Sequence, residues 1–566
     1  MAQNEVRVSL TSKQFPFKFD ELSSTVFINR GFEQQRQQLN GFDGDEPVQS
    51  FGICQAFYME NVLPMVRGYS SVHCRKQLDL IAAPYLTAEV TSVHILRDDA
   101  NNVALFAPAN GTNYIYDADA GGWRSYPFEG TLTGTASVAH LKGDSYICYA
   151  GLGLFLYNFY TRAMDVQLPA GINMSAVRGV AAANQYMLLW DGNTLYWSSA
   201  TAPLDFLPAL STGAGSTSVL AVRSPITQVL PISDGFICYT TTNAIGATYS
   251  GDPVNPWIFR EIPGSAGVAL AEHVTYEANL EAHFAWTTSG MQHVTLRRAE
   301  PLWPELTDSI ARGLYSDIVA PATVPTTVKA NRLSVRLATI GARYLTISLK
   351  DSESTGMYQF AYVYDLSGER WGKIKVPHTD IFEFRAPEFA DVTSYDDLDT
   401  DLLTYDDLLL TSYDSLGTQL EAGTVQFGES FGIIQSNGKV FTMTFADVLG
   451  NDAVGYAADH TEAGASEPCI IHGRYKLARP AGVELQQIQL TRAQDETITA
   501  LVHDTAGDIV SAVAVTSDQY APVNNDYLCR VYGDSVSLKL AGKFTLTDLL
   551  LRFRQAGTRN SPRRPV

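Results

Sequence analysis

The chain has 566 residues, of which 60 are acidic and 40 are basic, giving a formal net charge of −20. A single hydrophobic core stops growing at about 250–300 residues, so this length predicts several domains or one large closed repeat. Binding of nucleic acid by phosphate neutralisation needs clustered Lys and Arg. The excess of acids therefore excludes a conventional DNA-binding protein.

Residues 1–90 mix turn residues with isolated strands. The opening sequence, MAQNEVRVSLTSKQFPFKFDEL, has no apolar stretch of the kind found in a secretory signal. No window approaches the ~18 consecutive apolar residues of a membrane-spanning helix. We therefore expect a protein that is made in the cytoplasm and stays soluble or assembles there, with residues 1–90 as a distinct N-terminal segment.

Residues 91–390 are predicted to form a β-propeller. All seven tryptophans lie between Trp123 and Trp371, which sets this region apart from its flanks. A strand–turn–strand unit recurs there at intervals of roughly 40–55 residues, a period typical of propellers. The six units begin at Val103, Asp144, Asn184, Asp234, Glu281 and Arg343. One blade alone cannot bury both of its faces, whereas radial packing of neighbouring blades buries them.

We expect five to seven blades between about Val93 and Phe384, and an irregular protein of several β-sandwiches is the alternative. Cys148 and Cys238 lie in the apolar runs YICYA and FICYT, which predicts buried free thiols. The six cysteines include no C-x-x-C pair, so zinc binding is not expected.

Residues 391–420 form an acidic segment with three similar phrases, in which a Tyr is followed three residues later by a Leu. The phrases supply the residues Tyr395, Leu398, Tyr405, Leu408, Tyr413 and Leu416. One interpretation is an acidic surface loop. The other is an assembly segment that places Tyr and Leu in grooves of a partner, because Tyr suits interfaces that are apolar at one end and wet at the other.

Residues 421–566 are predicted to form an antiparallel sheet or sandwich, since they contain the alternating runs VELQQIQLTR, TITALVHD and SVSLKLAGKFTLTDLLLRFR. Together with the propeller, this predicts an all-β fold. The tail ends in the basic sequence PRRPV.

No catalytic signature is present: the sequence has no Walker A loop, no G-x-S-x-G, no H-E-x-x-H and no dinucleotide fingerprint. The ten histidines are scattered, with no pair at metal-ligand spacing. Two acidic loops, at Asp117–Asp119 and Asp397–Asp401, lack the remaining ligands of a calcium loop and are more simply turns. We expect no cofactor, no metal and no enzymatic activity.

Several phrases, in their order along the chain, resemble the tail nozzle (hub) proteins of short-tailed bacteriophages. The stretch SFGICQAFYMENVLPMVRGYSSV carries an E-N-x-x-P…G-Y signature, followed by TLYWSSATAPLDF, YVYDLSGERWGKI, the Tyr-Asp-Asp-Leu repeats and FRQAGTR. The signature consists of Glu60, Asn61, Pro64, Gly68 and Tyr69.

This resemblance implies a structural virion protein, assembled in the host cytoplasm, that forms a six-membered ring below the portal. Its partners would be itself, a tail adaptor protein, tail fibres or spikes, and genomic DNA that passes through the lumen without specific binding. A platform from the N- and C-terminal segments would form the DNA tube, and the propeller would project from it. Arg552, Arg554 and Arg559 are our candidates for the subunit joints.

Two other functions remain open at this point. A receptor-binding or tail-fibre protein predicts a trimer with long β-helical repeats, and no short β-helix period is visible. A propeller enzyme that degrades glycans predicts a cluster of carboxylates at the central funnel.

The assembly interpretation of residues 391–420 makes a direct prediction. Replacing Tyr395, Tyr405 and Tyr413 by Ser removes the apolar contacts of the segment, so the chain is expected to fold normally but to fail to enter the tail. Circular dichroism measures folding, and the protein content of purified particles measures incorporation. Incorporation at the wild-type level would contradict this role.

Overall fold

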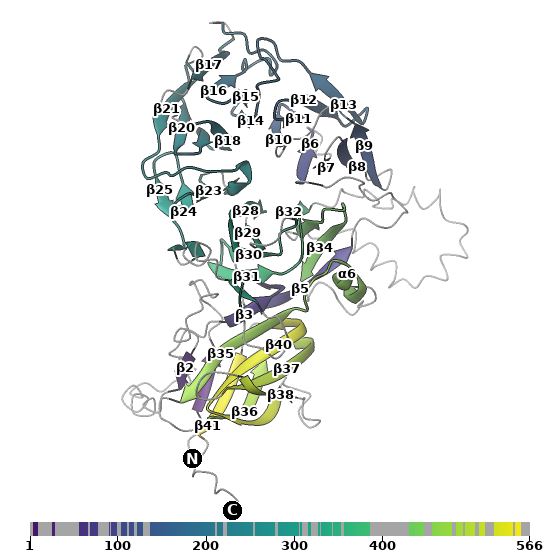
Figure 1. The fold of residues 1–566 in the computed structure, drawn as a ribbon, viewed down its shortest axis with the longest axis vertical. Coiled ribbons are helices and arrows are strands. Elements are labelled where there is room, and N and C mark those ends of the chain that lie inside the picture. Colours follow the sequence, from purple (N-terminus) through teal and green to yellow (C-terminus); the bar gives the residue numbers. More distant parts are fainter. Residues whose placement is uncertain are drawn as a thin grey trace, which may run out of the picture.

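The computed structural model of the chain is described for most of the centre and for the strands of both flanks. The described residues are 4–8, 25–28, 56–65, 68–76, 90, 92–98, 103–109, 112–117, 122–127, 136–209, 212–218, 224–252, 255–277, 281–304, 306–307, 315–317, 326–328, 330–341, 343–351, 356–384, 430–445, 456–477, 483–490, 493–503, 509–515, 526–546 and 549–555. They form a β-propeller above a β-platform (Figure 1), which confirms the predicted all-β fold. No helix among these residues is long and apolar enough to cross a membrane.

Five consecutive four-stranded antiparallel sheets make up the first five blades. Blades one and two are β6 (His94–Arg97), β7 (Val103–Ala109), β8 (Thr112–Asp117) and β9 (Gly122–Pro127), then β10 (Ser137–Leu141), β11 (Asp144–Tyr149), β12 (Gly153–Asn158) and β13 (Ala163–Gln167). Blades three and four are β14 (Gly179–Ala183), β15 (Tyr186–Trp190), β16 (Thr194–Trp197) and β17 (Gly215–Ser218), then β18 (Ile226–Ile232), β19 (Gly235–Thr240), β20 (Ala244–Tyr249) and β21 (Trp257–Glu261). Blade five is β22 (Val274–Tyr276), β23 (His283–Thr287), β24 (Gly290–Val294) and β25 (Ala299–Pro301), preceded by the 3-10 turn η1 (Ala271–His273).

Blade six follows the same plan, and blade seven does not. Blade six is β28 (Ala330–Ile340), β29 (Tyr344–Asp351), β30 (Phe360–Asp365) and β31 (Arg370–Ile374); the short pair β26 (Tyr315–Asp317) and β27 (Thr326–Val328) precedes it. Blade seven is β32 (Asp380–Phe384), β33 (Ser430–Ile434), β34 (Val440–Phe445) and the early strand β5 (Tyr69–Lys76). Three of its strands therefore lie outside the predicted range 91–390, because strands far apart in the sequence can pair once the fold brings their edges together.

The predicted repeat units correspond to the two middle strands of a blade. The unit at Val103 is β7 and β8, and the unit at Asp144 is β11 and β12. Middle strands are covered on both faces, so β15 and β19 are buried along their whole length. Cys148 and Cys238 lie on two of these strands as buried free thiols, as predicted.

The platform is a sandwich of two sheets built from both flanks. One sheet has the order β1-β41-β36-β39, from β1 (Asn4–Val8), β36 (Val483–Leu490), β39 (Asp526–Gly533) and β41 (Leu549–Gln555). The other joins β2 (Thr25–Ile28), β3 (Ala56–Glu60), β35 (Cys469–Leu477), β37 (Ala493–His503), β38 (Ile509–Val515) and β40 (Ser535–Leu546). The predicted alternating runs of the C-terminal segment form β36, β37, β40 and β41.

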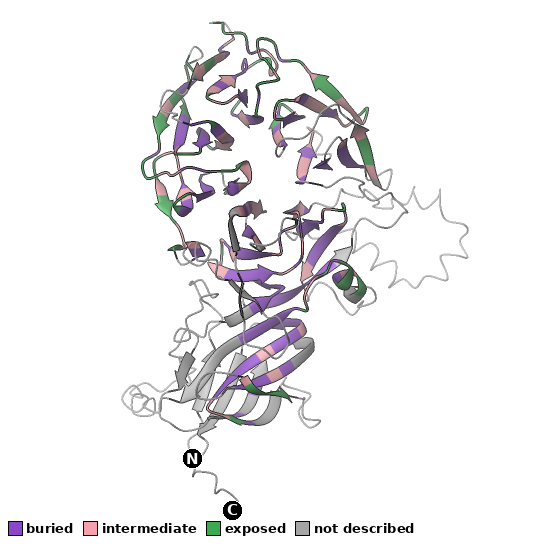
Figure 2. Ribbon diagram, viewed as in Figure 1, coloured by how far each residue is buried: buried purple, intermediate pink, exposed green. Residues whose placement is uncertain are grey.

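One hydrophobic core runs without interruption from the platform into blades five and six. It contains Leu485 and Leu538 of the platform, Trp286 of blade five and Trp371 of blade six. Burial is continuous where the two domains meet (Figure 2), at the strands β4 (Val62–Pro64) and β5. The short helix α6 (Tyr456–Glu462) packs against β5.

Candidate functional site

The E-N-x-x-P…G-Y signature runs from the end of β3 into the hairpin β4–β5, which lies where blade six, blade seven and the platform meet (Figure 1). On one side β4 pairs with β31 of blade six, through Val62 and Lys373. The first part of β5 pairs with β40 of the platform, through Tyr69 and Leu546, and its second part pairs with β34 of blade seven. This one hairpin therefore links all three sheets.

Asn61 fixes the start of the hairpin. Its backbone has a φ of 49°, in the left-handed region that Asn tolerates better than most residues, and its side chain is fully buried. The side-chain Nδ2 donates to the carbonyl oxygen of Ser466 at 2.6 Å, and Oδ1 accepts from the Lys375 N–H at 2.8 Å. Asn61 thus ties β4 to chain segments that are 314 and 405 residues away in sequence.

Glu60 and Gly372 complete this side of the joint. Lys375 Nζ lies 2.7 Å from Oε1 of Glu60, a carboxylate that is 6% exposed. A Cβ on Gly372 would lie 2.6 Å from the Val62 carbonyl oxygen and 2.8 Å from Cδ of Pro64. Blade six can therefore approach the hairpin this closely only with glycine at position 372.

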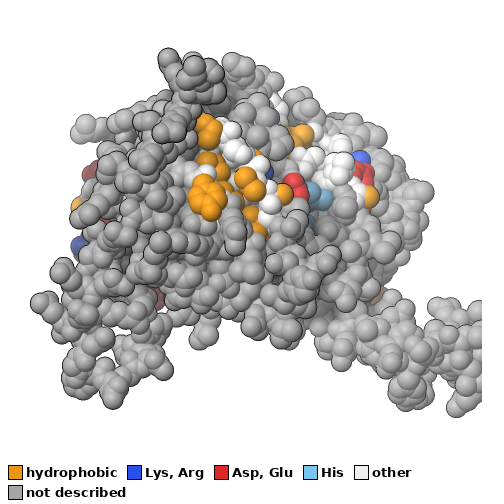
Figure 3. All heavy atoms as spheres, turned by 90° about the horizontal axis from the view of Figure 1, so that it is seen from below, with side chains coloured by type: hydrophobic (Ala, Val, Ile, Leu, Met, Phe, Trp, Pro, Cys, Tyr) orange, Lys and Arg blue, Asp and Glu red, His pale blue; other side chains and the backbone are white. Residues whose placement is uncertain are grey.

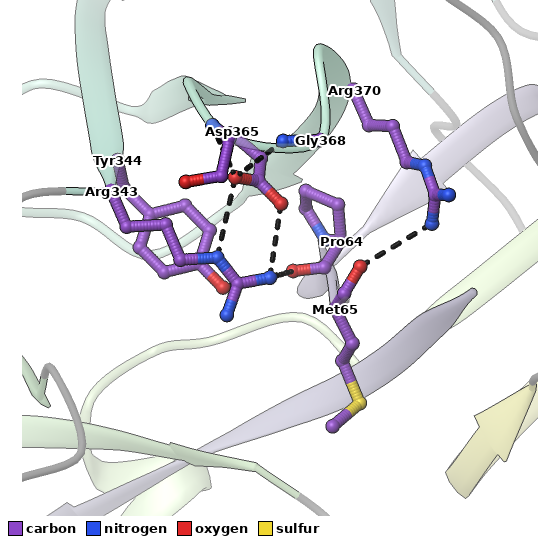
Figure 4. Close-up of polar contacts among 8 residues, drawn as sticks. Pro64, Met65, Arg343, Tyr344, Asp365, Gly368 and Arg370 are labelled. Carbon is purple, nitrogen blue, oxygen red and sulfur yellow. Dashed lines mark hydrogen bonds and ion pairs between the residues drawn. The ribbon is translucent and has the colours of Figure 1, made fainter. Parts of the chain in front are cut away.

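The turn of the hairpin is held by two turns of blade six, β28–β29 and β30–β31 (Figure 4). The Pro64 carbonyl oxygen accepts from the Tyr344 hydroxyl at 2.9 Å and from Arg343 Nη2 at 3.4 Å. Arg343 also forms two hydrogen bonds to the buried carboxylate of Asp365, at 3.0 and 3.2 Å. Arg370 Nη1 donates to the Met65 carbonyl oxygen at 3.3 Å.

Gly68 and Tyr69 finish the signature. Gly68 has a φ of 86°, which glycine adopts without steric cost, and its carbonyl oxygen accepts from the Met65 N–H at 3.1 Å. Tyr69 is buried, and burial raises the pKa of its hydroxyl, so this group stays neutral.

Beyond the signature, β5 contacts the platform and α6 through buried polar groups. Ser71 Oγ accepts from the Phe544 N–H at 2.9 Å. The Cys74 N–H donates to Nδ1 of His460 at 3.2 Å, and Nε2 of His460 donates to the Ser466 carbonyl oxygen at 2.6 Å. Asn61, just before β4, and His460, which binds β5 at Cys74, therefore both bind the carbonyl oxygen of Ser466.

These contacts hold backbone in place and leave no reactive group open to a ligand. Their carboxylates face Lys or Arg, their amides face carbonyl oxygens, and the thiol of Cys74 is buried, which raises its pKa. Among the described residues, no group of three or more His, Cys, Asp or Glu is placed to hold a metal ion. The arrangement is suited to joining domains rigidly.

A second polar cluster lies where blades six, seven and one meet. Asp380 of β32 accepts from Arg336 Nε and Nη2, each at 2.7 Å, and from the Val93 N–H at 2.8 Å. Asp380 is 3% exposed. Its contacts account for this carboxylate as a link between blades six, seven and one.

The structure places only part of the predicted assembly residues. Tyr395, Leu398, Tyr405, Leu408, Tyr413 and Leu416 lie outside the described residues, as do Arg559, Asp119 and residues 397–401. Arg552 and Arg554 lie on β41, where Arg552 is in register with Glu5 of β1 and Gln487 of β36, and Arg554 with Glu484. The role predicted for these residues stays a prediction.

Sequence reasoning missed the partners of the signature, which are Arg343, Tyr344, Lys375 and Ser466. No local pattern marks them, because they lie about 280 to 405 residues from the hairpin. A signal was present for blade seven, since SFGII and VFTMTF around the turn QSNGK repeat the strand–turn–strand plan of the other blades.

No protein-family model matches the sequence, and no curated protein matches it. Two similar solved structures are the dihydro-heme d1 dehydrogenase NirN in complex with DHE and BamB from Moraxella catarrhalis. The NirN match has a TM-score of 0.31 and 12% identity, and covers 56% of this chain and 61% of NirN. The BamB match has a TM-score of 0.36 and 12% identity, and covers 68% of this chain and 94% of BamB. This chain thus spans less than two thirds of NirN, and values this low identify no family and carry no functional conclusion.

Replacing Asn61 by Ala tests the joint. The variant loses the hydrogen bonds to Ser466 and Lys375 and keeps a left-handed backbone, so we expect the free energy of unfolding to fall by about 2–4 kcal/mol. Asn184→Ala is the matched control, because Asn184 has a φ of 54° but is exposed. The free energy of unfolding of this control is expected to fall by about 1 kcal/mol or less. Equal losses in urea unfolding would contradict the bridging role of Asn61.

The buried histidines predict loss of stability in acid. Burial lowers the pKa of His73 to about 3, and that of His283 and His378 to about 4. Below pH ~6.5 these histidines are protonated in the unfolded chain but not in the folded chain. The free energy of unfolding therefore falls by up to about 1.4 kcal/mol per histidine per pH unit. The contribution of these histidines to the free energy of unfolding is therefore fully present above pH ~6.5 and is lost as the pH falls towards ~4.

The urea midpoint measured between pH 7 and pH 4.5 checks this expectation. His378→Gln is expected to lower the midpoint at pH 7, since His378 is buried and bonds Ser348 and Val376, but to make its pH dependence shallower. An unchanged slope in this variant would show that His378 titrates normally.

Proposed function

We propose that the chain is a structural subunit of the tail nozzle of a short-tailed bacteriophage and forms part of the conduit for DNA ejection. The observation that supports this most is the position of the E-N-x-x-P…G-Y signature. Glu60 ends the platform strand β3, Asn61 connects it to β4, and Pro64, Gly68 and Tyr69 lie in the hairpin β4–β5 that joins the propeller to a platform made from both ends of the chain. This is the division of the chain that the resemblance implies.

The nature of the joint also favours a structural role. Its core continues from the platform into blades five and six, and its buried polar groups bind backbone and one another. A rigid joint of this kind suits a part that must keep its shape while DNA under pressure passes. It offers nothing that a catalyst requires, which supports a role without enzymatic activity.

The charge of the chain supports passage of DNA without binding. Each copy carries a net charge of −20, and in a ring any acid of the lumen is repeated in every copy. Such a ring repels phosphate over roughly a Debye length, ~8 Å at physiological salt. Basic residues belong at the joints or outside, because each Lys or Arg in the bore would bind phosphate and slow ejection.

Electron microscopy of purified particles, combined with their mass, tests the proposal. We expect a ring of copies with a central hole on the tail axis, and an electrostatic map of the assembled bore that is acidic or neutral. A trimeric fibre at the tail periphery would support a receptor-binding protein. A bore lined mainly by Lys and Arg, or a chain that stays monomeric in particles, would contradict the proposal.

A further inference from the structure

Among the described residues, the larger platform sheet ends in two edge strands. Its strand order across the platform is β2-β35-β40-β37-β38, and β3 shares with β2 the same side of β35. Among the described residues, β2 pairs only with β35, and β38 pairs only with β37. The two strands lie on opposite sides of the platform (Figure 1). A free edge presents backbone N–H and C=O groups that another strand can bind.

Strand β38 lacks the protection that edge strands usually have. Its sequence, IVSAVAV, has no charge and no proline, and residues 510–514 are exposed one after another. Successive side chains point to opposite faces of a sheet, so both faces are open: Val510 is 61% exposed and Val513 is 39% exposed. The face seen from below (Figure 3) has hydrophobic side chains next to His and charged ones; the exposure of β38 itself is given by the fractions of Val510 and Val513. An open, apolar edge of this kind is suited to the addition of a strand.

A second copy of this chain is the occupant that fits best. Copies with a net charge of −20 repel each other, so contact costs least where no charge is present. The opposite edge of the same sheet is β2, whose sequence TVFI is also uncharged. Two different edges on opposite sides of one sheet make a head-to-tail joint, and head-to-tail joints build rings when the rotation closes.

The strand directions also agree. Strand β2 runs parallel to β35, whereas β35, β40, β37 and β38 alternate in direction. Strand β38 is therefore antiparallel to β2. Rotation about an axis that lies along the strands keeps this relation between copies, so the new pair would be antiparallel, which is the more stable ladder.

We propose that β38 of one copy pairs with β2 of the next and continues the platform sheet around the ring. This inference rests on the proposed nozzle function and states how its subunits join. With six copies, as the resemblance implies, about 30 strands at ~4.8 Å spacing and ~40° tilt give a barrel about 60 Å across. That width leaves room for a DNA duplex and the side chains that face it.

Charges placed in β38 test the pairing. In the full-length chain, Val510→Lys with Val513→Lys puts two ammonium groups into each joint, so we expect ring formation to weaken by at least about tenfold while the chain stays folded. Val166→Lys with Leu168→Lys is the matched control, because these apolar residues at the propeller rim are 64% and 82% exposed. Sedimentation velocity measures the rings, and circular dichroism measures folding.

The outcomes separate the two proposals. Loss of rings in the β38 variant alone supports the joint. Rings in both variants contradict the joint and leave the nozzle function standing. A wild-type chain that forms no ring, either alone or in particles, contradicts the nozzle function as well.

Cross-linking between copies decides the matter if the lysine variant fails to fold. One chain carries Val26→Cys, and the other carries Ser511→Cys, Ala512→Cys or Val513→Cys, which covers three registers. Four native cysteines, Cys74, Cys148, Cys238 and Cys469, are buried, and the wild-type chain is the blank that accounts for the other two. We expect disulfide-linked dimers only when the two chains are mixed. Cross-linking by a β38 variant alone would indicate two-fold pairing, and it would contradict the joint, as would no cross-link in any mixture.

Discussion

The hydrogen bonds of strand β5 join the last blade of the propeller to blade six and to the platform. Its first residues pair with β4 and with β40 of the platform, and its last five residues pair with β34 of blade seven. Without β5, blade seven has three strands, and the platform loses its ladder to the propeller. A ring of blades needs one strand from a distant part of the chain to close it, and here that same strand also carries the second domain.

The polar groups around β5 follow from this double use. A strand between two domains is covered on all sides, so its neighbours must satisfy every backbone group that the irregular turns leave open. Asn61, Tyr344 and His460 do so by binding carbonyl oxygens and N–H groups of separate segments. Such bonds contribute little net stability each, but losing one partner leaves the other buried and unsatisfied. These bonds therefore specify which segments meet at the joint more than they add to its stability.

The sequence allowed the propeller and the platform strands to be predicted, because both depend on local patterns. Middle strands of blades are covered on two faces and read as apolar runs, as in YMLLW of β15. Outer strands such as β13 are half exposed and give a weaker signal. Blade seven was only partly visible, since its strands come from three parts of the chain. The joint could be located by its signature, but its partners could not, because Asn61 and Ser466 meet only through the completed fold.

The closure by β5 also bears on the order in which the molecule is made. A ribosome would release β5 early, whereas its partner β34 ends at Phe445, roughly 370 residues later. At about 5–20 residues per second, β5 waits about 20 to 70 s for β34, and the first blades have an unsealed end for most of that time. During this time both β5 and the face of blade one lack their final neighbours. Closing so large a loop carries an entropic cost, which makes the last step of propeller assembly late and exposed to mispairing between nascent chains.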